Sequence, residues 1–466
     1  MTPPHSNFEP FERKMAAAGS PPAAIEAFRY HYDRLVQGQT GTIAEAEIEA
    51  IEALPDLETL PTDRLAETGN AMLDRAAIIK LNGGLGTSMG MQQAKSLLVV
   101  KDGLSFLDII VRQAQRLAAA IPVVFMNSFS TQQDTRTALA AYPQLADSRV
   151  GLDFLQHRIP KVDAETLAPA KVPENPHLEW CPPGHGDIYL ALETSGMLRR
   201  LIDSGREVAF ISNSDNLGAV LDPVLLGYFI DQRLRFMMEV ADRTAMDRKG
   251  GHLARLASGR YGLREIAQTP ESDLKRFQDI ERHRYFNTNN IWLHLPSLES
   301  AMQKEGFLAL PMIRNRKPVD PRNRDSRPVY QLETAMGAAI SVFDAAGAIR
   351  VPRTRFTPVK STSDLLAVRS DAYTLTDRFQ LVPNPRRQLD PIQIDLDPAH
   401  YRLVDHFESR FPHGAPSLLA CESLRIEGDV RFGRGVTLTG PVAIVNATGK
   451  PFEIEDQRRI QGELRV

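Results

Sequence analysis

The stretch AAIIKLNGGLGTSMG, residues 76–90, decides the fold class. It begins with a short apolar run, which predicts a buried strand, and Gly83, Gly84 and Gly86 follow at once. Glycine lets a ligand approach the backbone closely, and successive N–H groups in such a loop can hold phosphate oxygens. An open α/β sheet binds its ligand at this place, directly after a strand. The segment therefore predicts an α/β domain that binds a phosphate-containing ligand.

Two standard loop motifs do not fit this segment. A Walker A loop ends in Gly-Lys-Ser/Thr, which is absent, and a dinucleotide fingerprint requires glycine where Met89 stands. Residues 86–90 formally match the G-x-S-x-G motif of hydrolases, with Ser88 as the nucleophile. That fold needs several strands and an oxyanion loop before the nucleophile, whereas the sequence upstream of Ala76 predicts helices. A hydrolase is therefore disfavoured, and a plain turn would not need so many glycines.

Strands and helices alternate after the loop, which is typical of a parallel, doubly wound sheet. The expected strands are residues 122–126, 152–156 and 207–211, and the expected helices are residues 105–120, 131–142 and 187–205. Later strands are separated by fewer helices, and they are expected at residues 235–241, 262–267 and 286–293. We therefore expect an α/β domain with a doubly wound mixed sheet over residues 71–383.

Residues 1–70 predict an N-terminal helical segment. Residues 25–36 have helical spacing, and Thr42 with Glu45 matches a capping box that predicts a second helix. Residues 1–22 carry prolines and small polar residues, which indicates a flexible lead-in. We expect these pieces to pack on the larger domain rather than to carry chemistry.

Residues 384–466 form the third predicted unit, after a proline-rich boundary at 381–391. Apolar residues there recur every six positions, in one row at Leu424, Val430, Val436 and Val442 and in a second at Ile426, Phe432, Leu438 and Ile444. A six-residue apolar period with glycine turns favours a parallel β-helix, in which each coil stacks on the next. Two ordinary hairpins are the alternative.

Composition narrows the function classes. Lys and Arg number 55 against 58 Asp and Glu, a formal net charge of −3, so nucleic acid is not expected as a partner. Cys181 and Cys421 are the only cysteines, which excludes a disulfide framework and a multi-cysteine metal site and favours a reducing compartment. We find no signal-peptide pattern and no apolar run long enough for a membrane span. We therefore expect a cytoplasmic protein without a membrane partner.

Charged residues near the predicted strands are candidates for the site. Lys95 follows the glycine loop and Lys360 precedes a Ser/Thr-capped helix, so both could contact a polyanionic ligand. Asp215, after the strand at 207–211, is placed to hold Mg²⁺, although aspartate often caps a helix instead. His185 stands in a loop of prolines and glycines ahead of a helix, where the N-terminus favours anions. A lone histidine is, however, more often structural.

Two further segments stay open. Asn287 and Asn289 share one face of a predicted strand, where buried amides need partners such as sugar hydroxyls. The run 314–328 is strongly basic, and such runs are most often solvated loops. No HExxH motif, Cys/His cluster or paired-carboxylate motif is present.

Several ordered segments together resemble one family. They are KLNGGLGTSMG, VVFMNSFSTQQDT, WCPPGHGDIY, SNSDNLGA, FNTNNIW, YQLETAMGAAI and FTPVKSTSDLL. They resemble the eukaryotic-type UTP–glucose-1-phosphate uridylyltransferases, and the six-residue repeats resemble that family's C-terminal left-handed β-helix. The resemblance implies a Rossmann-like nucleotidyltransferase domain. It also implies Mg²⁺-dependent transfer of uridylyl from UTP to glucose 1-phosphate, giving UDP-glucose and pyrophosphate.

The resemblance further implies roles for individual residues. The residues that it assigns to the nucleotide are Leu81, Asn82, Gly83, Gly84, Lys95, Gln156, Gly184, Asp215 and Lys360. Those that it assigns to the sugar phosphate are His185, Asn213, Asn289 and Glu265. Lys360 and Lys95 are the implied catalytic residues, and Asp215 is the implied Mg²⁺ ligand. Gln156 is implied to pair with uracil, because its amide offers a donor and an acceptor to the imide edge of that base.

The sequence departs from the family pattern beside the loop lysine. Ala94 stands where the family commonly has proline, and residues 91–93 differ from its usual Gly/Lys-containing text. This departure bears on the stiffness of the turn more than on the chemistry of the site.

Other functions remain possible at this stage. A broad-specificity UDP-sugar pyrophosphorylase or a UDP-N-acetylhexosamine pyrophosphorylase is the nearest alternative. A UDP-sugar glycosyltransferase usually shows a D-x-D metal pair after a strand, and the candidate Asp395-Leu396-Asp397 lies in the predicted linker. A non-catalytic assembly protein would need neither lysine. Self-association, if it occurs, is expected through residues 384–466.

Overall fold

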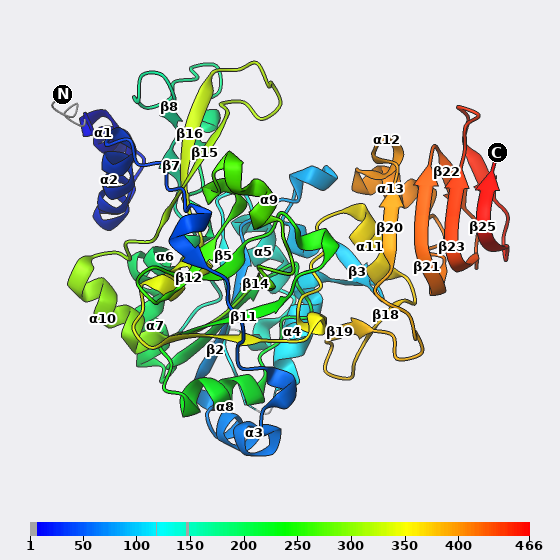
Figure 1. Ribbon diagram of the computed structural model, residues 1–466, viewed down its shortest axis with the longest axis horizontal. Helices are drawn as coiled ribbons and strands as arrows, with labels where there is room; N and C mark the ends of the chain where they lie inside the picture. The colour runs from blue at the N-terminus through cyan, green and yellow to red at the C-terminus, as the bar shows by residue number, and fades with distance from the viewer. Residues whose placement is uncertain (1–6, 118, 146–148) are drawn as a thin grey trace.

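The computed structural model describes residues 7–117, 119–145 and 149–466 and is built around a ten-stranded mixed sheet (Figure 1). Its strands are β1 (Ile48–Glu49), β2 (Ala76–Asn82), β5 (Val123–Asn127), β6 (Asp153–Leu155), β10 (Val208–Asn213), β11 (Phe236–Asp242), β12 (His252–Leu256), β13 (Tyr261–Arg264), β14 (Tyr285–His294) and β17 (Ala346–Arg350). Strands β10, β2, β5 and β6 pair in parallel, whereas β14 pairs antiparallel with β10, β11 and β12. The predicted mixed α/β sheet is confirmed.

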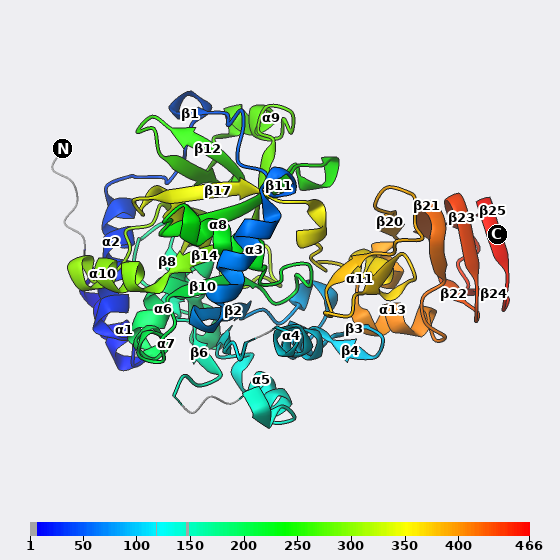
Figure 2. The ribbon, with the colours of Figure 1, turned by 90° about the horizontal axis from the view of Figure 1, so that it is seen from below.

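Helices cover both faces of this sheet. On one face lie α4 (Phe106–Gln115) and α8 (Pro223–Asp231), and on the other lie α6 (Ile188–Thr194), α7 (Met197–Asp203) and α10 (Leu295–Glu305). Side chains along β2 alternate between the two cores, so that Ile78 belongs to the first and Ile79 to the second. Figure 2 shows the sheet and the helices around it from a second direction. The sheet is therefore doubly wound, and the loop at the end of β2 stands on a strand that is buried from both sides.

The expected helix at 187–205 is broken. Gly196 has a left-handed φ of 72° between α6 and α7, a conformation that glycine adopts without strain and that interrupts a helix. The other predicted helices and strands of this domain are present with changes at their ends, and residue 118 of the helix expected at 105–120 lies outside the described residues. One of them, the strand expected at 262–267, ends early at Arg264.

The N-terminal segment contains α1 (Glu9–Ala17), α2 (Pro22–Val36) and α3 (Thr62–Ala71), and α2 confirms the helix expected at 25–36. Helices α1 and α2 are joined by packed aromatic rings, with Phe11 and Tyr32 4.7 Å apart between centroids. The segment packs on the sheet domain, as expected. The flexible lead-in expected over residues 1–22 is wrong for α1, which buries Phe11 and Met15, and residues 1–6 lie outside the described residues.

The helix expected after Thr42 is wrong. Residues Glu45–Glu47 form a short 3-10 turn, and strand β1 follows it. The Glu45 side chain is 4% exposed, and its carboxylate accepts hydrogen bonds from Arg264 at 2.7 Å and Arg282 at 2.8 Å. A buried carboxylate needs such partners, so this tertiary contact overrides the local helical pattern.

Smaller elements surround the main sheet. They are β3 (Val99–Lys101), β4 (Leu104–Ser105), α5 (Gln132–Leu139), β7 (Ile159–Pro160), β8 (Val162–Asp163), β9 (Trp180–Cys181), α9 (Leu274–Phe277), β15 (Met312–Pro318), β16 (Pro328–Thr334), α11 (Thr362–Arg369), β18 (Tyr373–Leu375) and β19 (Leu381–Pro383). Strands β15 and β16 form a hairpin that pairs with β8. The basic run 314–328 is thus partly strand, and only its middle is a loop.

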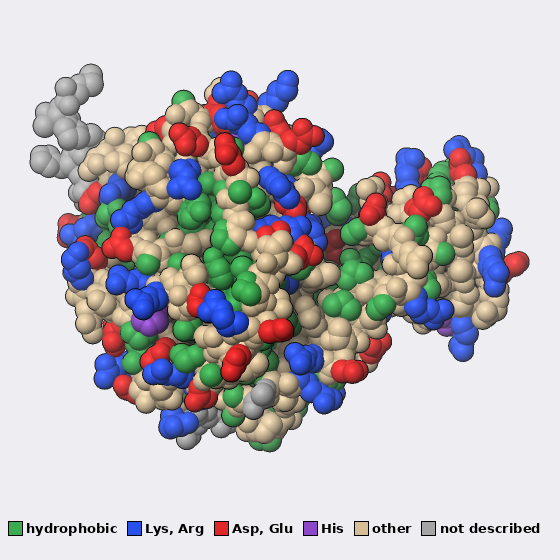
Figure 3. Space-filling model, turned by 60° about the horizontal axis from the view of Figure 1, so that its bottom comes forward, with side chains coloured by type: hydrophobic (Ala, Val, Ile, Leu, Met, Phe, Trp, Pro, Cys, Tyr) green, Lys and Arg blue, Asp and Glu red, His purple; other side chains and the backbone are tan. Residues whose placement is uncertain are grey.

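The C-terminal part forms a smaller lobe, joined to the main body through a narrower neck (Figure 3). Its elements are β20 (Gln393–Leu396), α12 (Pro398–Tyr401), α13 (Val404–Arg410), β21 (Ser417–Glu427), β22 (Val430–Phe432), β23 (Thr437–Val445), β24 (Phe452–Ile454) and β25 (Arg459–Arg465). Strands β20-β21-β23-β25 form one parallel sheet and β22-β24 form another. Leu424 pairs with Val442 and Ile426 with Ile444, so the six-residue rows stack, and the hairpin alternative is wrong.

Surface features are consistent with the composition. Charges of both signs intermingle over the face drawn in Figure 3. Within the described residues, no helix combines the length and apolarity needed to cross a bilayer. Cys181 and Cys421 are buried and unpaired with each other.

Candidate active site

The site begins where β2 and β10 end side by side. Leu81 pairs with Asn213, and Ser214 N–H donates to the Leu81 carbonyl at 3.1 Å, so the glycine loop and Asp215 leave the sheet together. The loop then folds back, because the N–H of Lys95 donates to the Gly84 carbonyl at 3.0 Å. Two segments that are far apart in the sequence thus share one edge of the sheet.

Lys95 and Asp215 meet at this edge as an ion pair. The Lys95 Nζ lies 2.7 Å from Asp215 Oδ2, and the two side chains are 15% and 20% exposed. Both charges are therefore reachable from solvent while each neutralises the other. A ligand that carries phosphates and a divalent cation can separate the pair, because the phosphates attract the ammonium and the cation attracts the carboxylate.

The turn before Lys95 is held by a side chain from α5. The N–H of Ala94 donates to Asp134 Oδ2 at 3.0 Å, and Ala94 is fully buried. Proline, which the resemblance leads us to expect at this position, has no N–H to donate. In this chain a hydrogen bond restrains the turn where a proline ring would otherwise do so.

Gln156 joins the glycine loop to the second loop of the site. Its Nε2 donates to the Gly184 carbonyl at 3.0 Å, and a side chain at Gly83 would come within 3.0 Å of its Oε1. The structure thus brings Gly83, Gln156 and Gly184 together. Asn82 differs, because its buried amide donates to Asn127 Oδ1 and Thr135 Oγ1, both at 2.8 Å. Its side chain therefore fixes β2 and leaves its backbone for a ligand.

The loop ahead of α6 places a histidine beside the site. Gly184 has a φ of 83° and ψ of 171°, and any Cβ there would overlap the Thr334 carbonyl oxygen, so glycine is required. His185 Nδ1 accepts the Met336 N–H at 2.9 Å, which leaves its proton on Nε2. Burial lowers the pKa of His185 to about 4, so the ring is neutral at pH 7 and donates from Nε2.

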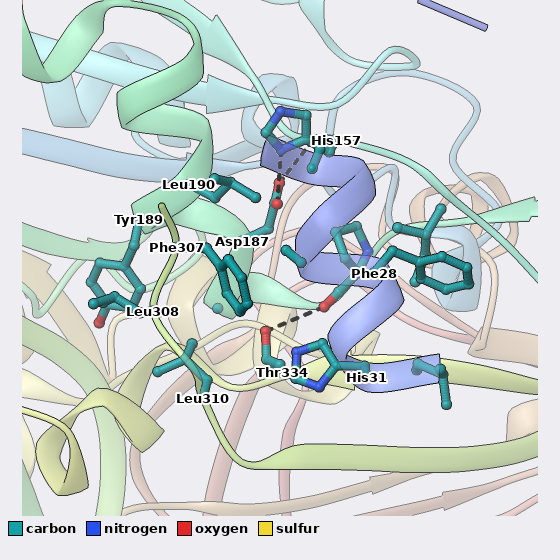
Figure 4. Close-up of a pocket in the computed structure, with 16 residues that line it drawn as sticks. Phe28, His31, His157, Asp187, Tyr189, Leu190, Phe307, Leu308, Leu310 and Thr334 are labelled. Carbon is teal, nitrogen blue, oxygen red and sulfur yellow. Dashed lines mark hydrogen bonds and ion pairs between the residues drawn. The ribbon is translucent and has the colours of Figure 1, made fainter. Parts of the chain in front are cut away.

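Sequence inspection missed a histidine–aspartate pair beneath this loop. Asp187 accepts the His157 backbone N–H at 2.7 Å, and its other carboxylate oxygen lies 2.8 Å from His157 Nδ1 (Figure 4). On the other side of the ring, Thr194 Oγ1 lies 3.0 Å from Nε2. His157 follows Gln156 and Asp187 follows His185 by two positions, so the pair ties the two loops together. No local pattern links residues this far apart in the chain.

An apolar cavity of about 60 Å³ lies behind the same loop, between α2 and the sheet domain. Phe28 and His31 of α2 face Leu308 and Leu310 across it, and Asp187 forms part of its wall (Figure 4). The loop that carries His185 is therefore supported from behind partly by the N-terminal helices.

A larger cavity of about 280 Å³ lies on the other side of His185. Four of the predicted residues line it together, namely His185, Glu265, Asn289 and Lys360. Its lining carries amide, imidazole, carboxylate and ammonium groups, which suit a ligand with many hydroxyls and an anionic end.

The strand ends around this cavity explain how its side chains are aimed. Asn289 has a positive φ of 58° at a register shift in β14, and Asn287 donates from Nδ2 to Asn289 Oδ1 at 2.9 Å. The two asparagines thus share one side, as predicted. Burial raises the pKa of the Glu265 carboxyl, and the positive charge of Lys360 partly offsets this. Lys360 itself is exposed and precedes the Ser361-capped helix α11.

The structure also decides three alternatives that the sequence left open, namely an Asp215 helix cap, a D-x-D metal pair and a Ser88 nucleophile. Asp222, not Asp215, caps α8 by accepting the N–H groups of Val224 and Leu225. Asp397 of the D-x-D pattern caps α12 through Ala399 and also accepts the Gly428 N–H, so both of its oxygens are engaged. Ser88 is exposed in the 3-10 turn Thr87–Met89.

The sequence model of the UTP–glucose-1-phosphate uridylyltransferase family matches residues 25–439 of the chain. The chain belongs to this family. It is 40% identical over 420 residues to the UTP–glucose-1-phosphate uridylyltransferase of Solanum tuberosum, covering 87% of this chain and 85% of that protein. It is 39% identical over 394 residues to that of Saccharomyces cerevisiae, covering 82% of this chain and 76% of the relative.

Solved structures agree with this membership along the whole chain. A mutant UDP-glucose pyrophosphorylase of Leishmania major in complex with UDP-glucose superposes with a TM-score of 0.91 at 42% identity, covering 99% of this chain and 100% of that one. The UDP-glucose phosphorylase of Trypanosoma brucei gives a TM-score of 0.88 at 43% identity, covering 98% and 99% of the two chains. The similarity thus includes the C-terminal lobe.

Proposed function

We propose that the chain catalyses uridylyl transfer from UTP to glucose 1-phosphate, giving UDP-glucose and pyrophosphate. The observation that carries this proposal is that two unlike sites adjoin. One is the glycine loop with the Lys95–Asp215 pair, which suits a triphosphate. The other is the polar cavity with Glu265, Asn289 and Lys360, which suits a sugar phosphate. The names and complexes of the relatives support the same reaction.

The chemistry needs positioned positive charge rather than proton transfer. An oxygen of glucose 1-phosphate forms a bond to the α-phosphorus of UTP while the bond from that phosphorus to the β-phosphate breaks, and pyrophosphate leaves. The attacking oxygen is already ionised at neutral pH, so no general base is required. Repulsion between the two anions is the main obstacle, and Lys95 and Lys360 offset it.

The nucleotide half of the site holds UTP mainly through backbone groups. Gln156 presents its amide to uracil, and the N–H groups around Gly83 and Gly84 face the phosphates. Leu81 and Asn82 act through the backbone, since the Asn82 amide is engaged elsewhere. The nearby Gly184 lets its loop approach the nucleotide closely.

The sugar half uses side chains. The Glu265 carboxylate accepts hydrogen bonds from sugar hydroxyls, and Asn289 and Asn213 supply further amide groups. Neutral His185 donates from Nε2 without bringing a charge near the phosphate. Of these groups, Glu265, Asn289 and His185 line the cavity together with Lys360.

Asp215 would hold Mg²⁺ in this reaction. A partly exposed carboxylate at a strand end is a suitable ligand, because Mg²⁺ binds one or two protein carboxylates and takes its other oxygens from phosphates and water. Within the described residues no cluster of three or more His, Cys, Asp or Glu side chains could form a closed metal site. When bound, the ion would neutralise triphosphate charge and orient the α-phosphate.

Pyrophosphate release is the direct test. The purified chain is given UTP and Mg²⁺ with glucose 1-phosphate, with galactose 1-phosphate, with N-acetylglucosamine 1-phosphate or with no sugar phosphate. Release that requires UTP and glucose 1-phosphate together supports the proposal. Comparable release with the other sugar phosphates would favour a broad UDP-sugar or UDP-N-acetylhexosamine pyrophosphorylase. No release with any sugar phosphate would contradict the proposal and favour a UDP-sugar glycosyltransferase.

Three finer features belong to the same proposal. The two parallel sheets of the C-terminal lobe support a left-handed β-helix over residues 384–466. Self-association, if the chain forms oligomers, would use the open edge of this lobe, which light scattering on the intact chain would test. The two free cysteines support a cytoplasmic location, which fractionation would test.

A further inference from the structure

A buried asparagine lies directly behind the candidate metal ligand. Asn216 follows Asp215 and is 1% exposed. Its Nδ2 donates to the Arg355 carbonyl at 3.1 Å and to Asn290 Oδ1 at 3.3 Å, and its Oδ1 accepts the Thr357 N–H at 2.9 Å. One amide thus connects three segments and uses both its donor and its acceptor.

Backbone contacts extend this connection toward Lys360. Asn216 forms an antiparallel bridge with Pro358, and the Val359 N–H donates to the Asp215 carbonyl at 3.2 Å. The chain that leads to Lys360 therefore runs along the Asp215–Asn216 segment. Lys360 is the next residue and is exposed to the cavity.

The far side of the connection is fixed by a buried ion pair. Arg355 Nε and Nη2 donate to the Glu239 carboxylate at 2.8 and 2.7 Å, and these residues are 3% and 0% exposed. Asn290 and Trp292 donate to the same carboxylate at 3.0 and 2.9 Å. A buried ion pair whose hydrogen bonds are all satisfied makes the surrounding core rigid. Asn216 therefore joins the segment of Lys360 to a rigid part of the core.

We propose that Asn216 is a positioning residue that sets where Lys360 stands relative to Asp215. The inference rests on the catalytic role given to Lys360 under the proposed function. Asn216 has no access to substrate, so it acts only by holding its neighbours. Displacing a catalytic group by about 1 Å can cost about 10²-fold in rate, which is the scale on which such a residue acts.

Asparagine is the side chain that this place requires. Alanine removes all three contacts, and serine is too short to reach the Arg355 carbonyl and the Thr357 N–H together. Aspartate keeps the acceptor for Thr357 but loses the donors and brings a charge into a buried place. The pattern of contacts thus explains the residue type.

A double-mutant cycle in kcat tests the proposal. Asn216→Ala should lower kcat by about 10-fold to 100-fold with the KM values for both substrates nearly unchanged, because the lost interaction acts in the transition state. In a Lys360→Ala background the same substitution should change kcat by less than about twofold, since there is no longer a lysine to position. Asn216→Ser serves as the milder second variant if the alanine variant folds poorly.

Asn446 provides a matched control in the C-terminal lobe. It is 7% exposed, its amide donates to the carbonyls of Asp429 and Lys450, and its Oδ1 accepts the Thr448 N–H, as Asn216 does with its own neighbours. Asn446→Ala should lower the melting temperature about as Asn216→Ala does but leave kcat near the starting value. A loss of kcat in both variants would mean a general loss of structure and would overturn the proposal.

The cycle also separates the inference from the function beneath it. If Lys360→Ala keeps near-normal turnover, the catalytic role of Lys360 fails and the inference with it. Suppose that Lys360→Ala lowers kcat as expected. If Asn216→Ala then has a normal kcat, Asn216 does not act through Lys360. If Asn216→Ala lowers kcat just as much when Lys360 is absent, Asn216 acts through Asp215 instead.

Discussion

The two halves of the candidate site are built in different ways. The nucleotide half stands on the ends of the parallel strands β2 and β10 and is lined largely by the backbone of two glycine-containing loops. The sugar half stands at the end of β13 and on β14, which both pair antiparallel with β12, and it is lined by side chains such as Glu265 and Asn289. Each half contains a lysine, Lys95 in the first and Lys360 in the second.

The difference predicts how each half responds to substitution. A site made of backbone tolerates no added atoms where the chain approaches itself, so changes there act on folding and binding together. A site made of side chains can lose one group while the backbone stays in place, so changes there act on one substrate. The two lysines stand apart from this division, because under the proposed function they act on the charge of the reacting phosphates.

Removing a lysine should therefore give the largest effect. Lys95→Ala and Lys360→Ala should each lower kcat by about 10²–10³-fold, the usual loss when one preorganised charge or donor is removed from a transition state. Steady-state pyrophosphate release measures both. Lys450→Ala, an exposed lysine of the C-terminal lobe, is the control and should retain activity. Near-normal turnover of either site variant would remove that lysine from the mechanism.

A methyl group at Gly184 in the nucleotide half should destabilise the fold. Gly184→Ala places a Cβ on the Thr334 carbonyl in a backbone region that costs other residues about 1–3 kcal/mol, so the melting temperature should fall and the KM for UTP should rise. Gly84→Ala is the matched variant for stability, because nothing lies within 4 Å of its Cβ position. Equal melting temperatures for the two variants would contradict a backbone-built loop at Gly184.

A change in the sugar half should act on one substrate and leave the fold intact. Glu265→Gln should raise the KM for glucose 1-phosphate by about 10-fold, since a hydrogen bond to a charged acceptor is lost, with little change in the KM for UTP. A matching rise in both KM values would place Glu265 outside the sugar half.

The same variant should be more stable than the parent chain at neutral pH. Burial raises the folded-state pKa of Glu265 above its unfolded value, so its favourable contribution is complete below the unfolded pKa and is lost as pH rises through the folded pKa. Glutamine avoids the cost of the buried charge. The gap in melting temperature should therefore be largest at neutral pH and close as pH falls through the raised pKa toward the ordinary glutamate range.

The meeting of the glycine loop, Lys95 and Asp215 was predictable because each of the two segments follows a strand of the sheet. Gly83, Gly84 and Lys95 follow one strand, and Asp215 follows another, so strand order alone brings them together. Parallel strands place such loops at one edge of a sheet. The parallel strands of the C-terminal lobe were predictable as well, because a local six-residue period repeats in space.

What the sequence did not reveal depends on contacts between distant residues. Glu45 enters a buried ion pair with Arg264, and this contact replaces a helix that the local pattern predicts. His157 with Asp187, and Asn216 with Arg355, are likewise unmarked by any spacing rule. Each is a buried polar group whose partners are fixed only once the chain has folded, so no local pattern can identify it.

The link between the two loops of the nucleotide half gives the smallest expected effect. His157→Ala removes one partner of the buried Asp187 and leaves the His157 backbone N–H bonded to it, so the loops should loosen rather than separate. The KM for UTP should rise by about 3-fold to 10-fold, the worth of one net hydrogen bond, while the KM for glucose 1-phosphate stays nearly constant. Thr194→Val, which removes only the outer partner of the ring, should have a still smaller effect. Equal rises in both KM values would mean that the pair supports His185 as much as Gln156, and the two halves would then share this support.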